Sequence, residues 1–182
     1  MRDSGLINRV LEPFDCCPWT AGSGRAAIQH RRAAPIYSVE ERRRRDETGW
    51  TLVQGILAPV QFFVFLVSLG LVVRTLLTGE GLAVATASVV LKTFVLYTIM
   101  VTGAIWEKVV FGRYLFAAAF FWEDVFSMLV IGLHTVYVAA VLFGWGDGRS
   151  QLLLALAAYV AYAINAAQFL MKLRVARLQA AG

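Results

Sequence analysis

The chain has 182 residues, of which 59% are hydrophobic, and it carries a formal net charge of +5. This hydrophobic share exceeds the roughly 45–50% of soluble globular domains, and the mean hydropathy of +0.65 also argues against that class. The basic residues border apolar segments and form no separate basic domain, which excludes a nucleic-acid-binding protein.

The first 45 residues are a basic tail without a sustained apolar period. They contain three of the four prolines and both cysteines, Cys16 and Cys17. Because no basic start is followed by a continuous apolar core, the tail is not a signal peptide. We expect it to be largely disordered, up to about Pro35. Two adjacent cysteines, with none elsewhere, exclude a disulfide framework and leave a metal ion short of ligands.

Four long apolar segments follow the tail, at residues 51–73, 82–106, 125–145 and 152–171. Each is close to the roughly 20 residues that cross a hydrocarbon core about 30 Å thick. None shows the polar stripe that a helix of a soluble bundle would need. We therefore predict an all-α membrane protein, with its domain at residues 46–178 and four transmembrane helices at about 51–74, 82–106, 123–145 and 151–171.

The basic residues fall in alternate connections between these helices. Only Arg74 and Arg149 lie in the connections that follow the first and third helices. Because positive charge is retained in the cytoplasm, we predict that both termini are cytoplasmic. The basic residues near the spans on that side are Arg42, Arg43, Arg44, Arg45, Lys108, Arg113, Lys172, Arg174 and Arg177.

A polar layer is expected at the cytoplasmic boundary, where Glu123 and Asp124 begin the third helix. A single helix over residues 114–145 would be about 48 Å long, so we expect residues 114–122 to lie along the interface instead. The helix dipole favours two carboxylates in the first turn, and a plain helix start facing water would have the same pattern. Similar depth is expected for Glu107, Lys108, Arg113, Trp50, Gln54 and Gln168.

A second polar layer is expected near the middle of the bundle. Lys92 and His134 each lie about 15 Å into their helices, counted from opposite ends. Ionisable groups at this depth cost at least about 2.5 kcal/mol and usually face a cavity or one another, so we expect a polar-lined pocket. The simpler alternatives are a core histidine bonded to a carbonyl, and interhelical contacts by Asn165 and Gln168. Two further polar residues at similar depth are Gln61 and Tyr162.

Three long strings in the membrane portion carry a family resemblance: "ERRRRDETGWTLVQGILAPVQFFVFLVSL", "VLKTFVLYTIMVTGAIWEKVVFGRYLFAAAFFWEDVFSMLV" and "LAAYVAYAINAAQFLMKLR". Together they closely resemble the 3-vinyl bacteriochlorophyllide hydratase family of photosynthetic bacteria. The resemblance runs from about Tyr37 to Leu178 and includes both polar layers, whereas residues 1–35 lie outside it.

The resemblance implies a hydro-lyase of bacteriochlorophyll a synthesis in the cytoplasmic or intracytoplasmic membrane. Such enzymes add water to the 3-vinyl group of chlorophyllide a or 3-vinyl bacteriochlorophyllide a, giving a 3-(1-hydroxyethyl) group. Hydration needs no redox cofactor and the substrate brings its own magnesium, which agrees with a chain that has no G-x-G-x-x-G motif, P-loop or cysteine cluster. The other expected partners are the lipid bilayer and neighbouring enzymes of the pathway.

This chemistry suggests roles for the carboxyl groups. Hydration needs a proton for the terminal vinyl carbon and a base that activates water. Two carboxyl groups in an apolar environment suit these tasks, since one can hold its proton while the other stays ionised. Glu123 and Asp124, with Glu107, are the candidate catalytic residues, and which is acid and which is base stays open. Adjacent residues on a helix point about 100° apart, so only one of Glu123 and Asp124 is expected to face the substrate. Glu123 is preferred for this role, because it lies eleven residues before His134 and therefore points in nearly the same direction.

The remaining polar residues are candidates for binding the substrate. A neutral imidazole nitrogen of His134 can ligate the substrate magnesium. Lys108 and Arg113 can pair with the substrate propionate at the membrane surface. The expected substrate-binding set is completed by Lys92, Asn165 and Gln168.

Two other functions stay open. A non-catalytic membrane protein that binds or assembles (bacterio)chlorophyll would use magnesium ligands and stacking aromatic rings, without need of Glu123 or Asp124. A proton or ion pathway through Lys92 and His134 would need a continuous polar file across the membrane. The outer half of the bundle is almost entirely apolar, which disfavours this third function.

Overall fold

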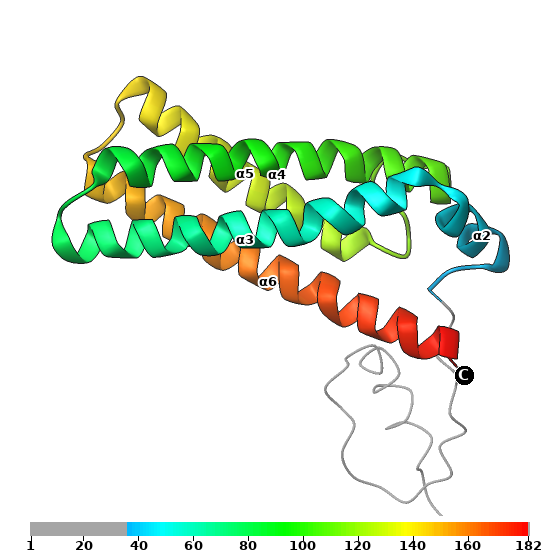
Figure 1. The fold of residues 1–182 in the computed structure, drawn as a ribbon. Helices are drawn as coiled ribbons and strands as arrows, with labels where there is room; N and C mark the ends of the chain where they lie inside the picture. The colour runs from blue at the N-terminus through cyan, green and yellow to red at the C-terminus, as the bar shows by residue number, and fades with distance from the viewer. Residues whose placement is uncertain (1–35, 182) are drawn as a thin grey trace, which may run out of the picture. The chain divides into compact units, whose positions relative to one another are not determined.

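The structure is a computed structural model that describes residues 36–181, with side chains described up to residue 177. The expected disorder up to Pro35, together with Cys16 and Cys17, lies outside the described residues. Four of the helices, α3 to α6, are long and apolar enough to cross a membrane, so the predicted all-α fold with four candidate spans is confirmed. The helices are α2 Val39–Glu47, α3 Gly49–Thr78, α4 Leu82–Phe111, α5 Phe121–Phe143 and α6 Gly148–Ala181 (Figure 1).

The helices do not end where the predicted spans end. α4 continues to Phe111 and α6 to Ala181, whereas the predicted ends were residues 106 and 171. α5 begins and ends two residues earlier than the predicted 123–145. Hydropathy marks only the part of a helix that suits hydrocarbon, while backbone hydrogen bonding continues into polar sequence until a stop signal. For α4 that signal is Gly112, which has a φ of +80°.

A short helix, α2, precedes the spans and includes residues 39–45 of the segment that was predicted as a tail. Ser38 caps this helix: its Oγ accepts from the Glu41 N–H at 3.2 Å, and the Glu41 carboxylate accepts from the Ser38 N–H at 2.8 Å. This reciprocal pair is a capping box. Acidic residues follow in the first turn and arginines lie in the last, as the helix dipole favours.

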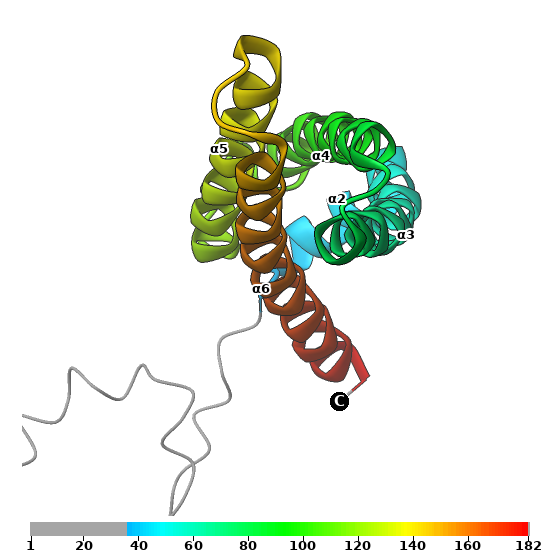
Figure 2. The same ribbon diagram turned by 90° about the vertical axis from the view of Figure 1, so that its left-hand side faces the viewer.

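The four long helices form two antiparallel hairpins. α3 packs most extensively against α4, and α5 against α6, while α3–α6 and α4–α5 contacts join the hairpins. Viewed from the end, α3 lies beside α4 and α5 beside α6 (Figure 2). The tight turn between α3 and α4 uses Gly79 and Gly81, whose φ angles of +77° and +83° would strain other residues.

Apolar side chains cover the outside of the four long helices as well as the inside. Val72, Val89 and Val130 are fully buried in the core. Phe63 on α3 and Leu142 on α5 are 67% and 75% exposed. Such large exposed apolar side chains along every helix suit contact with lipid and would be unfavourable in water.

Polar side chains tie the hairpins together inside the bundle. The Ser68 hydroxyl of α3 lies 2.7 Å from the Ser88 hydroxyl of α4 and 2.6 Å from the Tyr159 hydroxyl of α6. Nearer the other end, the Gln54 amide donates to the Thr102 hydroxyl at 2.8 Å. These hydrogen bonds set the register of α3 against α4 and join α6 to α3.

Candidate active site

Residues 112–120, the α4–α5 loop, connect the two hairpins. The loop occupies most of the segment, residues 114–122, that was expected along the interface, and α5 begins after it at Phe121. Phe116 within the loop has a φ of +59°. A bulky residue in this left-handed conformation costs about 1–2 kcal/mol. Contacts from the surrounding helices must therefore hold the loop in place.

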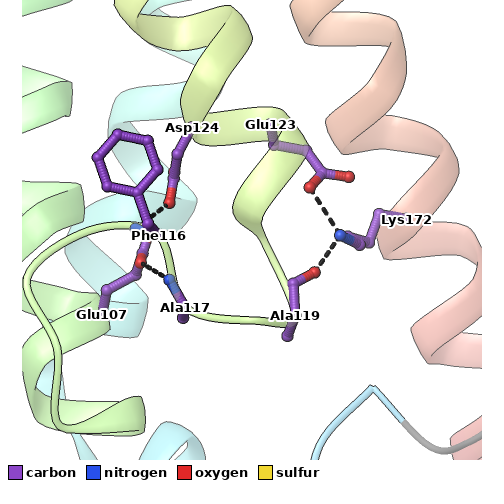
Figure 3. Close-up of polar contacts among 7 residues, drawn as sticks. All are labelled: Glu107, Phe116, Ala117, Ala119, Glu123, Asp124 and Lys172. Atoms are coloured by element: carbon purple, nitrogen blue, oxygen red, sulfur yellow. Dashed lines mark hydrogen bonds and ion pairs between the residues drawn. The ribbon is translucent and has the colours of Figure 1, made fainter.

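Two buried carboxyl groups accept hydrogen bonds from the backbone of the α4–α5 loop (Figure 3). Oδ2 of Asp124 accepts from the Phe116 N–H at 2.7 Å, and Oε2 of Glu107 accepts from the Ala117 N–H at 3.4 Å. Asp124 is 3% exposed and Glu107 is 6% exposed. The Asp124 contact helps to hold Phe116 in its strained conformation.

The carboxyl groups of Glu107 and Asp124 also lie beside each other and interact. An ionised carboxylate can only accept, so a hydrogen bond between the two groups requires one of them to carry a proton. Neither carboxyl group forms an ion pair with a lysine or arginine of the described residues. α4 and α5 thus bring together two carboxyl groups that form no ion pair within the described residues.

Glu123 has a different partner, Lys172 on α6. The Lys172 Nζ atom lies 2.7 Å from Oε2 of Glu123. The same ammonium donates to the carbonyl oxygen of Ala119 in the α4–α5 loop (Figure 3). It also lies 4.7 Å from the ring centroid of Phe120. Lys172 therefore joins α6, the loop and the first turn of α5 at one point.

The structure brings together the three carboxyl groups that the sequence nominated, Glu107, Glu123 and Asp124, which we call the carboxyl cluster. Its pairing differs from the sequence-based preference, because Asp124 contacts Glu107 while Glu123 turns towards α6. Adjacent residues on a helix point about 100° apart, which explains the split. Lys172 was not nominated as a site residue. Its only signal was its place just after the last apolar segment.

Lys108 and Arg113 lie outside the carboxyl cluster. Both side chains are exposed. The Lys108 ammonium donates to the carbonyl of Gly112 at 2.9 Å and lies 5.3 Å from the ring centroid of Tyr114. These two basic residues are exposed at the same end of the bundle as the carboxyl cluster.

Lys92 and His134 meet in the middle of the bundle and are both fully buried. The Lys92 Nζ atom lies 2.6 Å from Nε2 of His134, and Nδ1 of His134 lies 2.7 Å from the Val130 carbonyl oxygen. Nδ1 must donate to that carbonyl, so Nε2 accepts from the ammonium. Neither ring nitrogen is free, which argues against the hypothesis that His134 ligates the substrate magnesium. The simpler alternative, a core histidine bonded to a carbonyl, describes the observed contact.

Asn165 and Gln168 lie one to two turns from Lys172 on α6. The Asn165 amide donates to the Ser127 hydroxyl of α5 at 2.9 Å, as expected of an interhelical contact. Ser127 follows Glu123 by one turn, so this contact adjoins the carboxyl cluster. Five residues have buried side-chain atoms without a hydrogen-bond partner in the described residues: Arg44, Gln61, Tyr137, Asn165 and Gln168.

Comparison with known proteins identifies relatives over the membrane portion. Residues 37–175 match the family described as 2-vinyl bacteriochlorophyllide hydratase. A protein of that name from Cereibacter sphaeroides is 66% identical over 152 residues, which cover 84% of this chain and 92% of the relative. Another from Rhodobacter capsulatus is 67% identical over 146 residues, covering 80% of this chain and 85% of the relative. No solved structure matches the chain significantly.

The matched family agrees with the resemblance found in the sequence. Both descriptions name a hydratase of a vinyl bacteriochlorophyllide. The match covers α2, the four long helices up to Val175, the carboxyl cluster and Lys172. The chain belongs to the 2-vinyl bacteriochlorophyllide hydratase family.

Proposed function

We propose that this protein adds water to the vinyl group of chlorophyllide a or 3-vinyl bacteriochlorophyllide a, giving the 1-hydroxyethyl group during bacteriochlorophyll synthesis. Membership of a hydratase family supports the reaction class. The carboxyl cluster is the observation that carries the proposal, because it supplies buried acid and base groups at one end of apolar helices. Hydration by general acid–base catalysis needs such groups and no resident cofactor.

The reaction can be followed atom by atom. The π electrons of the vinyl group form a bond from its terminal carbon to a proton of the acid. The cation left on the adjacent carbon is stabilised by conjugation with the macrocycle, and the oxygen of a water molecule bonds to it. A base removes the extra proton from that oxygen. The proton is returned to the enzyme, so the net change is the addition of one water molecule.

The carboxyl cluster has the chemical groups for both proton transfers. Glu107 and Asp124 lie beside each other, and neither forms an ion pair within the described residues. Glu123 lies at the start of the same helix as Asp124. Low exposure strengthens the electrostatic effect of each group on a reacting carbon, because water screens it weakly.

We place the carboxyl cluster at the cytoplasmic face, with both termini in the cytoplasm. The charge distribution of the loops supports this orientation. The apolar macrocycle of the substrate can then reach the carboxyl cluster from the bilayer while its propionate stays at the membrane surface. Lys108 and Arg113, exposed at this end, are the candidates to bind that propionate. Enzymes that make the substrate or use the product in the same membrane are the natural partners.

Incubation of the purified protein with chlorophyllide a tests the proposal. Mass analysis of the extracted pigment should show the gain of one water molecule, with none in a protein-free control. Native membranes that hold the folded protein provide a second preparation. If pigment binds in both preparations but gains no water, the hydratase assignment is wrong and a non-catalytic pigment-binding protein is favoured.

A further inference from the structure

The three members of the carboxyl cluster have unequal partners. Glu123 is the only one that forms an ion pair within the described residues, with Lys172. Glu107 and Asp124 face each other and accept backbone hydrogen bonds from neighbouring residues of the α4–α5 loop, Ala117 and Phe116. The cluster thus consists of a carboxyl–carboxyl pair and a carboxylate–ammonium pair.

The carboxyl–carboxyl pair is suited to hold one proton. A hydrogen bond between Glu107 and Asp124 needs a proton on one of them, and two adjacent anions without an ion-pair partner of their own would repel. The two backbone N–H groups stabilise the oxygens that remain as acceptors. One shared proton therefore satisfies both side chains.

The carboxylate–ammonium pair is suited to hold the loop. In the ion pair between Glu123 and Lys172, the negative charge of one side chain is balanced by the positive charge of the other. The Lys172 ammonium also donates a hydrogen bond to the Ala119 carbonyl oxygen and lies over the Phe120 ring. Ala119 is two residues from Ala117, whose N–H reaches Glu107. The pair thereby supports the loop segment that positions Glu107.

We infer that Glu107 and Asp124 together store the proton that hydration consumes, whereas Glu123 and Lys172 are positioning residues that hold the α4–α5 loop. The inference rests on the proposed function for the reaction itself. The shared proton bonds to the terminal vinyl carbon, and the pair is briefly left as two carboxylates. The proton released by the attacking water then returns to the pair, which restores the starting state without another acid.

The location of the proton can be tested without substrate. A protonated carboxyl group has a C=O stretching band that an ionised one lacks, so infrared difference spectra of the purified protein report it. The band should disappear in Glu107→Gln, and it should shift and weaken in Asp124→Asn. It should be retained in Glu123→Gln, which is the matched control. Loss of the band in Glu123→Gln alone would overturn the inference. This result is independent of whether the protein hydrates the vinyl group.

The positioning role of Lys172 needs a second set of variants. Lys172→Met leaves Glu123 unpaired, so we expect turnover to fall about 10-fold or more while the pH profile keeps its shape. Lys172→Arg keeps the charge and should restore most of the activity. The double variant Glu123→Gln with Lys172→Met removes both charges, so no unpaired charge is left and the yield of folded protein should recover. Low turnover in this variant would then result from a misplaced α4–α5 loop and not from misfolding. If Lys172→Met alters the pH profile as Glu107→Gln does, Lys172 takes part in proton transfer and the inference is wrong.

Discussion

The ring of Tyr37 stacks on the ring of Phe111, with centroids 5.7 Å apart and planes inclined by 16°. The Phe120 ring lies 6.2 Å from Tyr37, and the Arg45 guanidinium lies 4.8 Å above it. Burial raises the pKa of the Tyr37 hydroxyl, despite the opposing effect of Arg45, so this ring stays neutral at physiological pH. The segment before α2 is thereby anchored on both ends of the α4–α5 loop.

Because Tyr37 packs against the ends of the α4–α5 loop, we expect the protein to need the N-terminal chain only from about this residue onwards. Deletion of residues 2–35 should leave membrane insertion and hydration intact, because it keeps Tyr37 and α2. Tyr37→Ala should lower the free energy of unfolding by about 1–3 kcal/mol, through the loss of aromatic packing. Thermal unfolding in detergent and the hydration assay measure the two effects. Loss of activity in a deletion variant that accumulates normally would reveal a function of the tail.

His134 should contribute to stability more than to pigment binding. His134→Ala removes the hydrogen-bond partner of the buried Lys92 Nζ atom, and a buried polar group left without its partner commonly costs about 1–3 kcal/mol. His134→Gln keeps an acceptor and should unfold at a higher temperature than His134→Ala. The absorption band of bound pigment should be the same in His134→Gln as in the native protein. A shifted band in a variant of native stability would show that His134 ligates the substrate magnesium after all.

The orientation of the helices can be tested with reporter fusions. Fusions after Leu77 and after Gly148 should report a periplasmic location, whereas fusions after Arg113 and after Leu178 should report the cytoplasm. The reason is the excess of basic residues at one end of the spans. A single reversed fusion would place the carboxyl cluster on the other side or break the four-span topology.

Much of the fold could be predicted because a long apolar segment is itself the signal of a membrane-spanning helix. Each apolar segment of about 20 residues became one helix, and only its ends were misplaced. α2 was missed for the converse reason, since VEERRRRDE offers no apolar face and forms outside the apolar segments. Its signal was nevertheless present in Ser38 and Glu41, the two residues of the capping box.

The sequence predicted at which depth in the membrane the site residues lie, but not which side chains contact each other. Counting residues along helices placed Glu107 level with Asp124, and Lys92 level with His134, and both pairs are in contact. Which side of α5 faces α4 and which faces α6 depends on how the two hairpins pack, and no local pattern records that. Lys172 was missed for this reason, because its contact with Glu123 requires the register of α6 on α5.

The most direct test measures hydration by volume-conserving variants of the Glu107–Asp124 pair. Glu107→Gln and Asp124→Asn keep the size of each side chain and an acceptor for the loop, and they remove the carboxyl group that can transfer a proton. With chlorophyllide a as substrate and mass detection of the product, turnover should fall about 100-fold or more in each variant, while pigment binding persists. Hydration at the native rate in both variants would contradict the account, because the carboxyl cluster would then serve only to hold the loop.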